Sequence, residues 1–405
     1  MAHPKVLAMV MAGGRGKRLF PLTFERSKPA VPFGGRTCIV DFVLSNLVNS
    51  HIFSIYLLVQ YQSQSLIDYV RENWGLSAVI QDHFVTVVPP QMRFGPDWFQ
   101  GTADAVFQNL NLIRYHKPEL VAVFGADHIY RMDIRQMIDF HIEKNADVTV
   151  AARPVPIKEG NAFGIIACDI DGRIRAFEEK PGHPTPMPTD PNRVYCSMGN
   201  YIFNTNTLIE ALADAQRKKE HDFGNYVIPS IVGKNRIYAY DFETNDIPGI
   251  KQYEEKGYWR DVGTIKAFWE AHQDILGDKP LFELGNELWP IRPSRNTLPA
   301  AKIRRGEIVN SMIAEGTVIN NAKIVNSVIR RGVVIEDDVE ILDSIIMDHV
   351  LLKKGCRLNK TIVDRSNIIE EGVHIGKGSG KPYLRAYMDP SGIAVVASEQ
   401  QALRI

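Results

Sequence analysis

The chain has 405 residues, of which 45% are hydrophobic and 23% are charged. This length is too great for one compact core, so we expect two or three domains. Its 47 lysines and arginines balance 47 aspartates and glutamates, so neither nucleic acid nor a membrane surface is an expected partner. No apolar run reaches the roughly 18 residues of a membrane helix. We expect the apolar stretch near the start to be a core strand and not a secretory signal.

The cysteines and histidines show no metal or disulfide pattern. The four cysteines are scattered and form no CxxC pair, which argues against a disulfide framework and a zinc site. The eleven histidines include no HExxH motif, so zinc-dependent hydrolysis has no support. A reducing, cytoplasmic location is the simplest expectation.

In residues 1–277, short aliphatic runs alternate with longer amphipathic ones. Buried strands of a largely parallel sheet are predicted at "VLAMVMA" (6–12), "SIYLLVQ" (54–60), "LVAVFGAD" (120–127) and "DVTVAARPV" (147–155). Helices are predicted at "SQSLIDYVRENW" (63–74), "TADAVFQNLNLIRYH" (102–116) and "IRQMIDFHIEKN" (134–145). This alternation predicts an open α/β sheet that binds its ligands at the carboxyl ends of the strands.

A glycine-rich, cationic loop follows the first predicted strand. Gly13, Gly14 and Gly16 offer backbone N–H groups that can cradle phosphate oxygens. Arg18 can add a bidentate fork and Lys28 a point charge. The spacing fits neither a Walker A loop nor a dinucleotide fingerprint. The loop therefore indicates a phosphate site, with a purely structural turn as the alternative.

Two aspartates occupy positions suited to a metal ion. The stretch "VAVFGADHIYRMD" places Asp127 at the carboxyl edge of the sheet, and "KGYWRDVGTIKAFWEAH" places Asp261 just before a helical pattern. Such oxygen ligands suit Mg²⁺. The alternative for Asp127 is that it caps the next helix. With the glycine loop, the two aspartates predict phosphoryl or nucleotidyl transfer, in which positioning and charge dominate.

A segment rich in proline, asparagine and glycine follows at 278–301, and we interpret it as a linker. We expect Trp289 and Ile291 of this segment to pack against another part of the chain.

The period of the sequence changes again in residues 302–405. An aliphatic residue recurs every five to seven positions, preceded two places earlier by a small or aliphatic one. The aliphatics expected to point inward are Val318, Ile324, Ile329, Val334, Ile341, Ile346, Leu352, Leu358, Val363, Ile369 and Ile375. This is the hexapeptide period of a parallel β-helix, with ordinary hairpins as the alternative. We expect this region, with a carboxyl-terminal tail, to supply stability and contact surface.

The stretch "LAMVMAGGRGKRLFPLT…SKPAVPFGG" resembles the signature of the sugar-nucleotide pyrophosphorylases. The resemblance narrows to the glucose-1-phosphate adenylyltransferases through "DFVLSNLVNS", "VQYQSQSL", "WFQGTADAVFQN", "GADHIYRMD", "AFGIIA", "FEEKP", "SMGNYIF", "HDFGNYVIP", "YWRDVGT" and "WPIR". It covers nearly the whole chain. It implies a Rossmann-like nucleotidyltransferase domain followed by a left-handed β-helix. The implied reaction is Mg²⁺-dependent transfer of the adenylyl group of ATP to α-D-glucose 1-phosphate, in glycogen biosynthesis.

The same resemblance implies roles for single residues on the nucleotide side. Arg18, Lys28 and Asp127 are the implied catalytic residues, and Asp127 and Asp261 the implied Mg²⁺ ligands. The implied nucleotide-binding residues are Gly13, Gly14, Gly16, Arg18, Gly101 and Thr102.

A second set of residues is implied for the sugar phosphate and for regulation. The implied contacts to glucose 1-phosphate are Phe99, Gly164, Glu179, Lys180, Ser197, Asp222 and Phe223, with Lys180 on the phosphate. Gln60 and Trp98 match positions thought to link the regulatory and catalytic sites. The resemblance also implies a homotetramer that can respond to small-molecule effectors.

Several residues depart from the family pattern. Glu25 stands where relatives activated by a sugar bisphosphate carry a lysine, and Pro32 and Cys38 replace a histidine and an arginine. We therefore expect that activator site to be altered or lost. Phe99 replaces a tyrosine of many bacterial relatives and loses its hydroxyl group. Asn200, in an otherwise apolar strand, also departs, and the sequence offers no reason for it.

Three alternatives remain at this stage. The same fold could use UTP, dTTP or GTP, because the residues that select the base cannot be placed by spacing. The chain could be a non-catalytic regulatory subunit, although such subunits tend to lose some of the charged residues present here. A hexapeptide acyltransferase is the third, but His349 and His374 are weak candidates for its catalytic histidine.

Overall fold

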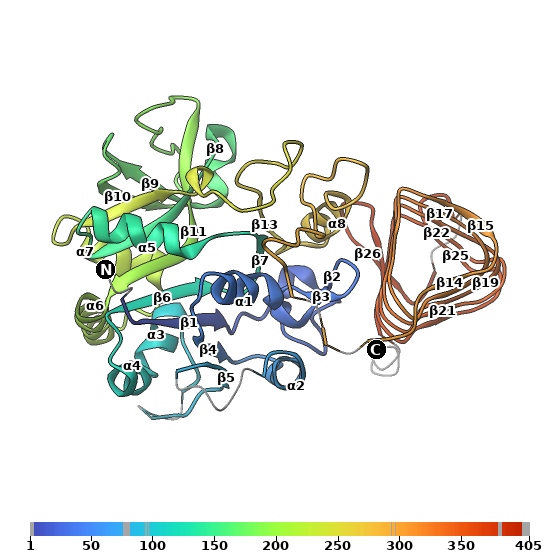
Figure 1. Cartoon of the computed structure of the whole chain (residues 1–405), viewed down its shortest axis with the longest axis horizontal. Helices are drawn as coiled ribbons and strands as arrows, with labels where there is room; N and C mark the ends of the chain where they lie inside the picture. Colours follow the sequence, from blue (N-terminus) through green and yellow to red (C-terminus); the bar gives the residue numbers. More distant parts are fainter. Residues whose placement is uncertain are drawn as a thin grey trace.

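The structure is a computed structural model that describes residues 4–75, 82–93, 95, 97–292, 294–295, 297–379 and 383–398. Two bodies lie side by side along the long axis of the molecule (Figure 1). The first contains the amino terminus and a central sheet, and the second is a solenoid with a triangular cross-section. The predicted carboxyl-terminal tail lies outside the described residues from 399 onward. Every helix in the described residues falls short of the length and apolarity that a bilayer span requires.

A nine-stranded sheet is the centre of the first body. Along its main path the order is β10, β9, β11, β6, β1, β4 and β5, and β8 and β12 continue it beside β11. The strands β6, β1, β4 and β5 are parallel, whereas β11 runs antiparallel to β6. The strands are β1 (Val6–Ala12), β4 (Ser54–Val59), β5 (Phe84–Val88), β6 (Leu120–Gly125), β8 (Val148–Pro156), β9 (Gly164–Cys168), β10 (Ile174–Glu179), β11 (Arg193–Asn204) and β12 (Ile237–Asp241). All four strands predicted from the sequence form, which confirms the open α/β sheet.

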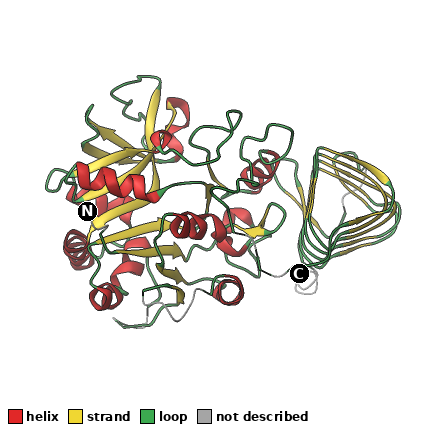
Figure 2. Ribbon diagram, viewed as in Figure 1, coloured by secondary structure: helices red, strands yellow, loops and turns green. Residues whose placement is uncertain are grey.

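Helices cover both faces of this sheet (Figure 2). The buried residues of α1, α2 and α5 pack with Ala8 and Val10 of β1, and those of α3, α4 and α6 pack with Leu7 and Met9. Alternate residues of β1 thus serve opposite faces, as a strand requires. The helices are α1 (Val40–Asn49), α2 (Ser63–Asn73), α3 (Thr102–Phe107), α4 (Leu110–His116), α5 (Ile134–Glu143), α6 (Thr205–Lys218), α7 (Ile228–Ile231) and α8 (Ile265–Gln273), with shorter turns η1 (Lys17–Leu19), η2 (Lys28–Ala30), η3 (Ile157–Ala162), η4 (Phe223–Val227) and η5 (Phe242–Thr244).

The helix predicted over 102–116 is in fact two helices, α3 and α4. The break falls at Asn109, whose backbone has φ −111° and ψ 18°. Its side-chain amide donates to the carbonyl oxygen of Ala105 at 2.8 Å. A short polar side chain that bonds locally to the backbone competes with the helix, which accounts for the interruption.

The second body is a left-handed parallel β-helix, as predicted. One wall stacks β14, β17, β19, β21 and β24, with β15, β22 and β25 beside them, and another stacks β16, β18, β20, β23 and β27, closed by β26. The strands are β14 (Lys302–Ile303), β15 (Gly306–Val309), β16 (Met312–Ile313), β17 (Val318–Val325), β18 (Val328–Ile329), β19 (Val334–Leu342), β20 (Ile345–Ile346), β21 (Leu351–Leu352), β22 (Arg357–Asn359), β23 (Thr361–Val363), β24 (Ile368–Ile369), β25 (His374–Gly376), β26 (Ala386–Met388) and β27 (Ala394–Val396). Strands of successive coils pair in parallel, which excludes ordinary hairpins over most of this region.

Two of the aliphatics predicted to point inward do not. Val334 is 38% exposed and Val318 is half-buried, whereas their neighbours Ile335 and Ile319 are fully buried. Thr317 and Val333, one place earlier, are fully buried too. Because successive side chains of a strand point to opposite sides, the inward positions on these two coils lie one residue away from the predicted ones. The other nine aliphatics are buried as predicted.

A short hairpin of the first body anchors the solenoid. The hairpin consists of β2 (Pro32–Phe33) and β3 (Thr37–Cys38). The guanidinium of Arg330, which is 1% exposed, donates to the carbonyl oxygens of Phe33, Gly34 and Thr37 at 3.0, 2.7 and 3.1 Å. It also pairs with Asp348 at 3.0 Å. A fully buried cation is therefore satisfied on one side by the hairpin backbone and on the other by its own domain.

The junction has a second ion pair and an apolar core. Arg26 of the first body forms a buried ion pair with Asp364 of the solenoid. One apolar cluster contains Phe33 and Phe268 together with Ile345 of the solenoid. In the segment 278–301, Trp289 and Ile291 are buried as predicted. The limits of the domains, at 277/278 and 301/302, stay predictions.

We expect Arg330→Met to destabilise the protein by about 3–5 kcal/mol, because it removes the shared donor to three buried carbonyl oxygens and weakens the pairing of buried Asp348. The matched control is Arg357→Met, since Arg357 pairs with Glu340 at the exposed surface of the same solenoid. That variant should lose less than about 1 kcal/mol. Urea unfolding followed by tryptophan fluorescence measures both, and equal losses would contradict the anchoring role of Arg330.

Candidate active site

The carboxyl ends of three parallel strands meet at one edge of the sheet. The pairing of Met11 with Gly125 and of Ala12 with Val59 brings the ends of β1, β6 and β4 together. A cavity of about 620 Å³ opens at this edge. The predicted site residues that line it are Gly13, Gly14, Gly16, Arg18, Lys28, Gln60, Phe99, Gly101, Thr102 and Asp127. The sequence therefore placed the glycine loop and Asp127 at the correct edge.

The glycine loop has the geometry of a binding loop. Gly16 has φ +60°, and a Cβ atom there would lie 2.9 Å from Cγ2 of Thr23, so glycine is required at this position. The hydroxyl of Thr23 donates to the carbonyl oxygen of Gly16 at 3.0 Å and holds the turn. A Cβ atom on Gly14 would meet no atom within 4 Å, so open space surrounds it. The loop turns at Gly16 and leaves the backbone around Gly14 accessible from the cavity.

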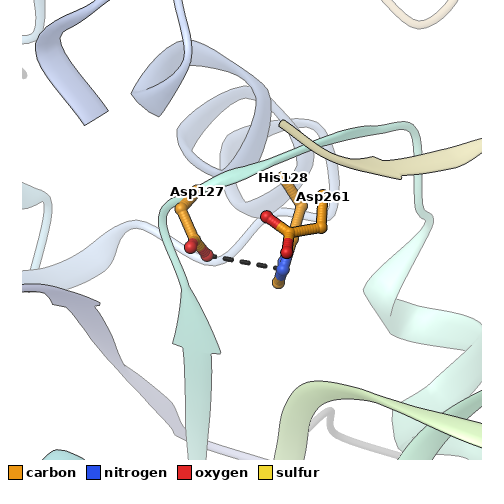
Figure 3. A group of neighbouring side chains, drawn as sticks. All are labelled: Asp127, His128 and Asp261. Atoms are coloured by element: carbon orange, nitrogen blue, oxygen red, sulfur yellow. Dashed lines mark ion pairs between the residues drawn. The ribbon is translucent and has the colours of Figure 1, made fainter. Parts of the chain in front are cut away.

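Asp127 and Asp261 come together although they are far apart in the sequence. The short strands β7 (His128–Tyr130) and β13 (Trp259–Asp261) pair antiparallel, which puts Asp261 opposite His128. One ligand atom from each of Asp127, His128 and Asp261 lies within 4.8 Å of the other two (Figure 3). The capping alternative for Asp127 is excluded, because β7 follows it directly and Asp133 caps α5 by accepting from the backbone of Arg135.

The ammonium group of Lys28 bridges the two carboxylates. Its Nζ lies 3.0 Å from Oδ2 of Asp127 and 2.8 Å from Oδ1 of Asp261. Burial opposes the charge on Lys28, but the two carboxylates raise the pKa of its ammonium above the ordinary value. Burial likewise opposes the charge on Asp127, but His128 and Lys28 bring the pKa of that carboxyl below its ordinary range. Both groups therefore stay ionised at neutral pH.

The arrangement of the two carboxylates is compatible with a divalent cation. A single cationic atom already reaches one oxygen of each carboxylate. Two carboxylate oxygens are the ligands that Mg²⁺ prefers. The guanidinium of Arg18 lies 3.8 Å from Oδ2 of Asp261 and is 72% exposed, so it borders this cluster on the open side.

The second wall of the cavity joins residues predicted for the nucleotide to residues predicted for glucose 1-phosphate. A Cβ atom on Gly101 would lie 2.2 Å from the carbonyl oxygen of His221, so the two chain segments touch there. The hydroxyl of Thr102 donates to Oδ2 of Asp222 at 3.0 Å and accepts from the backbone N–H of Phe223 at 3.1 Å. The start of α3 and the segment 221–223 are therefore in direct contact.

The remaining residues predicted to contact glucose 1-phosphate cluster next to that segment, outside the residues that line the cavity. Gly164 and Gly224 both face Oε2 of Glu179, at 3.0 and 3.6 Å from their Cβ positions. Glu179 also pairs with Lys180 at 3.3 Å, and both are exposed. Two further predicted residues contact Tyr201: Phe223 stacks on its ring at 5.6 Å, and Ser197 hydrogen-bonds to it.

The residues predicted for regulation lie in two places. Gln60 donates to the backbone oxygen of Phe99 at 3.1 Å. The ring of the exposed Trp98 packs at a tilt against that of Tyr61, with centroids 5.6 Å apart, on the cavity rim. Three of the departures from the family pattern, by contrast, line a second cleft of about 530 Å³ between the sheet domain and the solenoid: Glu25, Pro32 and Cys38.

Some residues at the cavity were missed by the sequence analysis. His128 follows Asp127 directly, and its position next to a predicted ligand was a usable signal. Gly199 and Gly263 line the cavity at bends that the sequence did not mark. A Cβ atom on Gly263 would lie 3.0 Å from both Arg18 and Asp261, which shows how tightly this corner is packed.

This sheet, with its glycine loop and paired carboxylates, has the architecture of a nucleotidyltransferase. The sequence profile of the family described as "Nucleotidyl transferase" matches residues 7–278, and a profile described as "GlmU-like, C-terminal hexapeptide" matches residues 293–396. The chain is thus an enzyme of the nucleotidyltransferase class.

Named relatives narrow this class. Over 394 residues the chain is 62% identical to the glucose-1-phosphate adenylyltransferase of Thermodesulfovibrio yellowstonii, covering 97% of this chain and 96% of the relative. Proteins of the same name from an Anaeromyxobacter species and from Corynebacterium glutamicum are 44% and 45% identical, and each match covers at least 97% of both chains. The chain belongs to the glucose-1-phosphate adenylyltransferase family.

We expect Gly14→Ala to keep the melting temperature of the wild type and to weaken binding of a nucleoside triphosphate, because its methyl group would enter open space beside the loop N–H groups. Gly101→Ala should instead lower the melting temperature, because its methyl group would collide with the backbone of His221. Differential scanning fluorimetry and calorimetric titration with triphosphate measure both. Unchanged binding by folded Gly14→Ala would contradict a phosphate role for this loop.

Proposed function

We propose that this chain is a Mg²⁺-dependent glucose-1-phosphate adenylyltransferase. It would transfer the adenylyl group of ATP to α-D-glucose 1-phosphate, giving ADP-glucose and pyrophosphate, for the synthesis of a glycogen-type glucan. The observation that carries the proposal is the cluster of Lys28, Asp127 and Asp261 beside a glycine loop, in a chain whose relatives bear that enzyme's name. Residues 1–277 are the proposed catalytic domain.

The nucleotide side of the site binds and neutralises phosphate. Backbone N–H groups of the glycine loop face the triphosphate, and Arg18 and Lys28 supply positive charge to the leaving pyrophosphate. Gly101 and Thr102 hold the opposite wall. Mg²⁺, when bound by Asp127 and Asp261, would supply charge neutralisation on the transferring phosphoryl group.

The sugar phosphate provides the nucleophile. An oxygen of its phosphate attacks the α-phosphorus of ATP, the bond from that phosphorus to the bridging oxygen breaks, and its electron pair leaves with pyrophosphate. No base is needed, because the attacking oxygen is already anionic. Lys180 is proposed to bind this phosphate, while Glu179, Ser197 and Asp222 orient the sugar. The contact of Thr102 with Asp222 supports the close alignment of both substrates that an in-line attack demands.

We expect turnover with ATP and little with UTP, dTTP or GTP when purified protein is incubated with glucose 1-phosphate and Mg²⁺. Asp127→Asn should reduce turnover on the order of 100-fold or more, because it removes one charge from the cation site. Pyrophosphate release measures both. Asp133→Asn is a matched control, since Asp133 caps α5 away from the cavity, and it should keep most of the activity.

Each other outcome has a distinct meaning. Preference for another triphosphate would contradict the choice of adenine and keep the reaction type. Folded protein without turnover on any of the four would favour the regulatory subunit. Full activity of Asp127→Asn would contradict the assignment of the metal site.

We also propose that the protein is a cytoplasmic homotetramer, as the family resemblance implies. Ile303 and Val309, on the first strands of the solenoid, are about half exposed, and a solenoid end of this kind needs covering. A neighbouring subunit would supply that cover.

We expect fructose 1,6-bisphosphate to activate less than tenfold, which corresponds to a coupling of about 1.4 kcal/mol. The reason is that Glu25, which accepts a hydrogen bond from Ser398 at 3.0 Å, brings a negative charge to the interdomain cleft. Initial rates with and without the bisphosphate measure the effect. Glu25→Lys should gain activation, and saturable activation of the wild type beyond tenfold would contradict the prediction.

A further inference from the structure

Asn200 is a fully buried polar residue within β11. The pairing of this strand with β8 shifts register between Ser197 and Tyr201. The preceding residue, Gly199, has φ +70°, a left-handed conformation that interrupts the regular pairing of β11 with β8 at this point. The pairing of β11 with β6 correspondingly starts at Tyr201, opposite Val123.

Because of this irregularity, a backbone N–H at the end of β6 has no carbonyl partner among the described residues of β11. Ala126 donates its N–H to Met11 of β1 at 3.1 Å, so the N–H of Gly125 points to the opposite side, toward β11. At this point the backbone of β11 is not paired with β6. The acceptor that Gly125 meets is the side-chain oxygen of Asn200, at 3.2 Å. The asparagine amide thus takes the place of a strand carbonyl, and without it the donor would lack that bond.

The other half of the amide reaches the far end of the same segment. Nδ2 of Asn200 donates to the hydroxyl of Tyr130 at 3.3 Å. Asn200 therefore contacts both ends of residues 125–130, which contain Asp127 and His128. Because β7 pairs with β13, the position of this segment also sets where Asp261 lies.

We propose that Asn200 is a positioning residue for the cation site: its amide holds residues 125–130 in the conformation that brings Asp127 to Lys28 and Asp261. This inference rests on the proposed function only in taking the two carboxylates as the cation ligands.

The test uses Mn²⁺ as the probe and the full-length protein. Asn200→Ala should weaken Mn²⁺ binding about tenfold, the size of effect expected when a partner behind a metal ligand is lost. The matched control is Asn204→Ala: Asn204 lies in the same strand and donates to the backbone of Ala146, away from the cavity. It should lower the melting temperature while its Mn²⁺ affinity stays within twofold of wild type. Electron paramagnetic resonance titration measures the affinities.

Hydrogen–deuterium exchange gives a readout that needs no metal. Backbone amides of residues 125–130 should exchange faster in Asn200→Ala and at the wild-type rate in Asn204→Ala. Tyr130→Phe removes only the tyrosine hydroxyl, keeps the bond to Gly125, and should weaken Mn²⁺ binding less than Asn200→Ala does. It also serves as the test if Asn200→Ala does not fold, because then unchanged exchange and affinity in Tyr130→Phe would overturn the proposal.

The outcomes separate this inference from the function on which it rests. If Asp127→Asn abolishes Mn²⁺ binding and Asn200→Ala matches the wild type, the positioning role alone is overturned. If wild-type Mn²⁺ binding does not depend on Asp127, the metal assignment and the positioning role are overturned together. Loss of affinity in Asn200→Ala and equal loss in Asn204→Ala would show a general effect of stability and overturn the inference.

Discussion

Two carboxylates that approach one another need a cation between them, and this requirement organises the whole site. Two like charges about 4 Å apart repel by roughly 4 kcal/mol at an effective dielectric constant of 20. Here the ammonium of Lys28 contacts both Asp127 and Asp261 and offsets that repulsion. The end of β6 supplies one carboxylate, the pairing of β13 with β7 supplies the other, and η2 supplies the lysine. The contacts of one ammonium group with two carboxylates thus hold together three stretches that are far apart in the sequence.

The start of α3 and the segment 221–223 are also joined by very few groups. Thr102 begins α3 and Asp222 precedes η4, and one hydroxyl group joins them through an accepted and a donated hydrogen bond. Gly101 allows this because any side chain would collide with the backbone of His221. The residues predicted for the nucleotide and those predicted for the sugar phosphate are thus in direct contact, as the proposed in-line attack demands.

Much of the fold and the place of the candidate site could be predicted from the sequence, because strands buried on both faces and the loops at their ends have strong local sequence patterns. β1 forms over the predicted residues, and Asp127 lies at the predicted edge. The helix at 102–116 was predicted as continuous because the bond from Asn109 back to Ala105 is invisible to apolar spacing. Val318 and Val334 were misplaced by one residue, since two adjacent aliphatics allow either to point inward. Asn200 could not be interpreted, because its partner Gly125 is 75 residues away in the chain and offers only a backbone N–H.

The anchoring of the solenoid reaches further than stability. Lys28 lies between two points that the solenoid holds: Arg26, through Asp364, and the β2–β3 hairpin, through Arg330. Lys28 therefore lies within a short segment that contacts the solenoid on both sides of it in the sequence. A rotation of the solenoid relative to the sheet would displace both contacts and shift the ammonium of Lys28 relative to Asp127 and Asp261. Contacts from the solenoid thus flank a charged group of the candidate active site on both sides in the sequence.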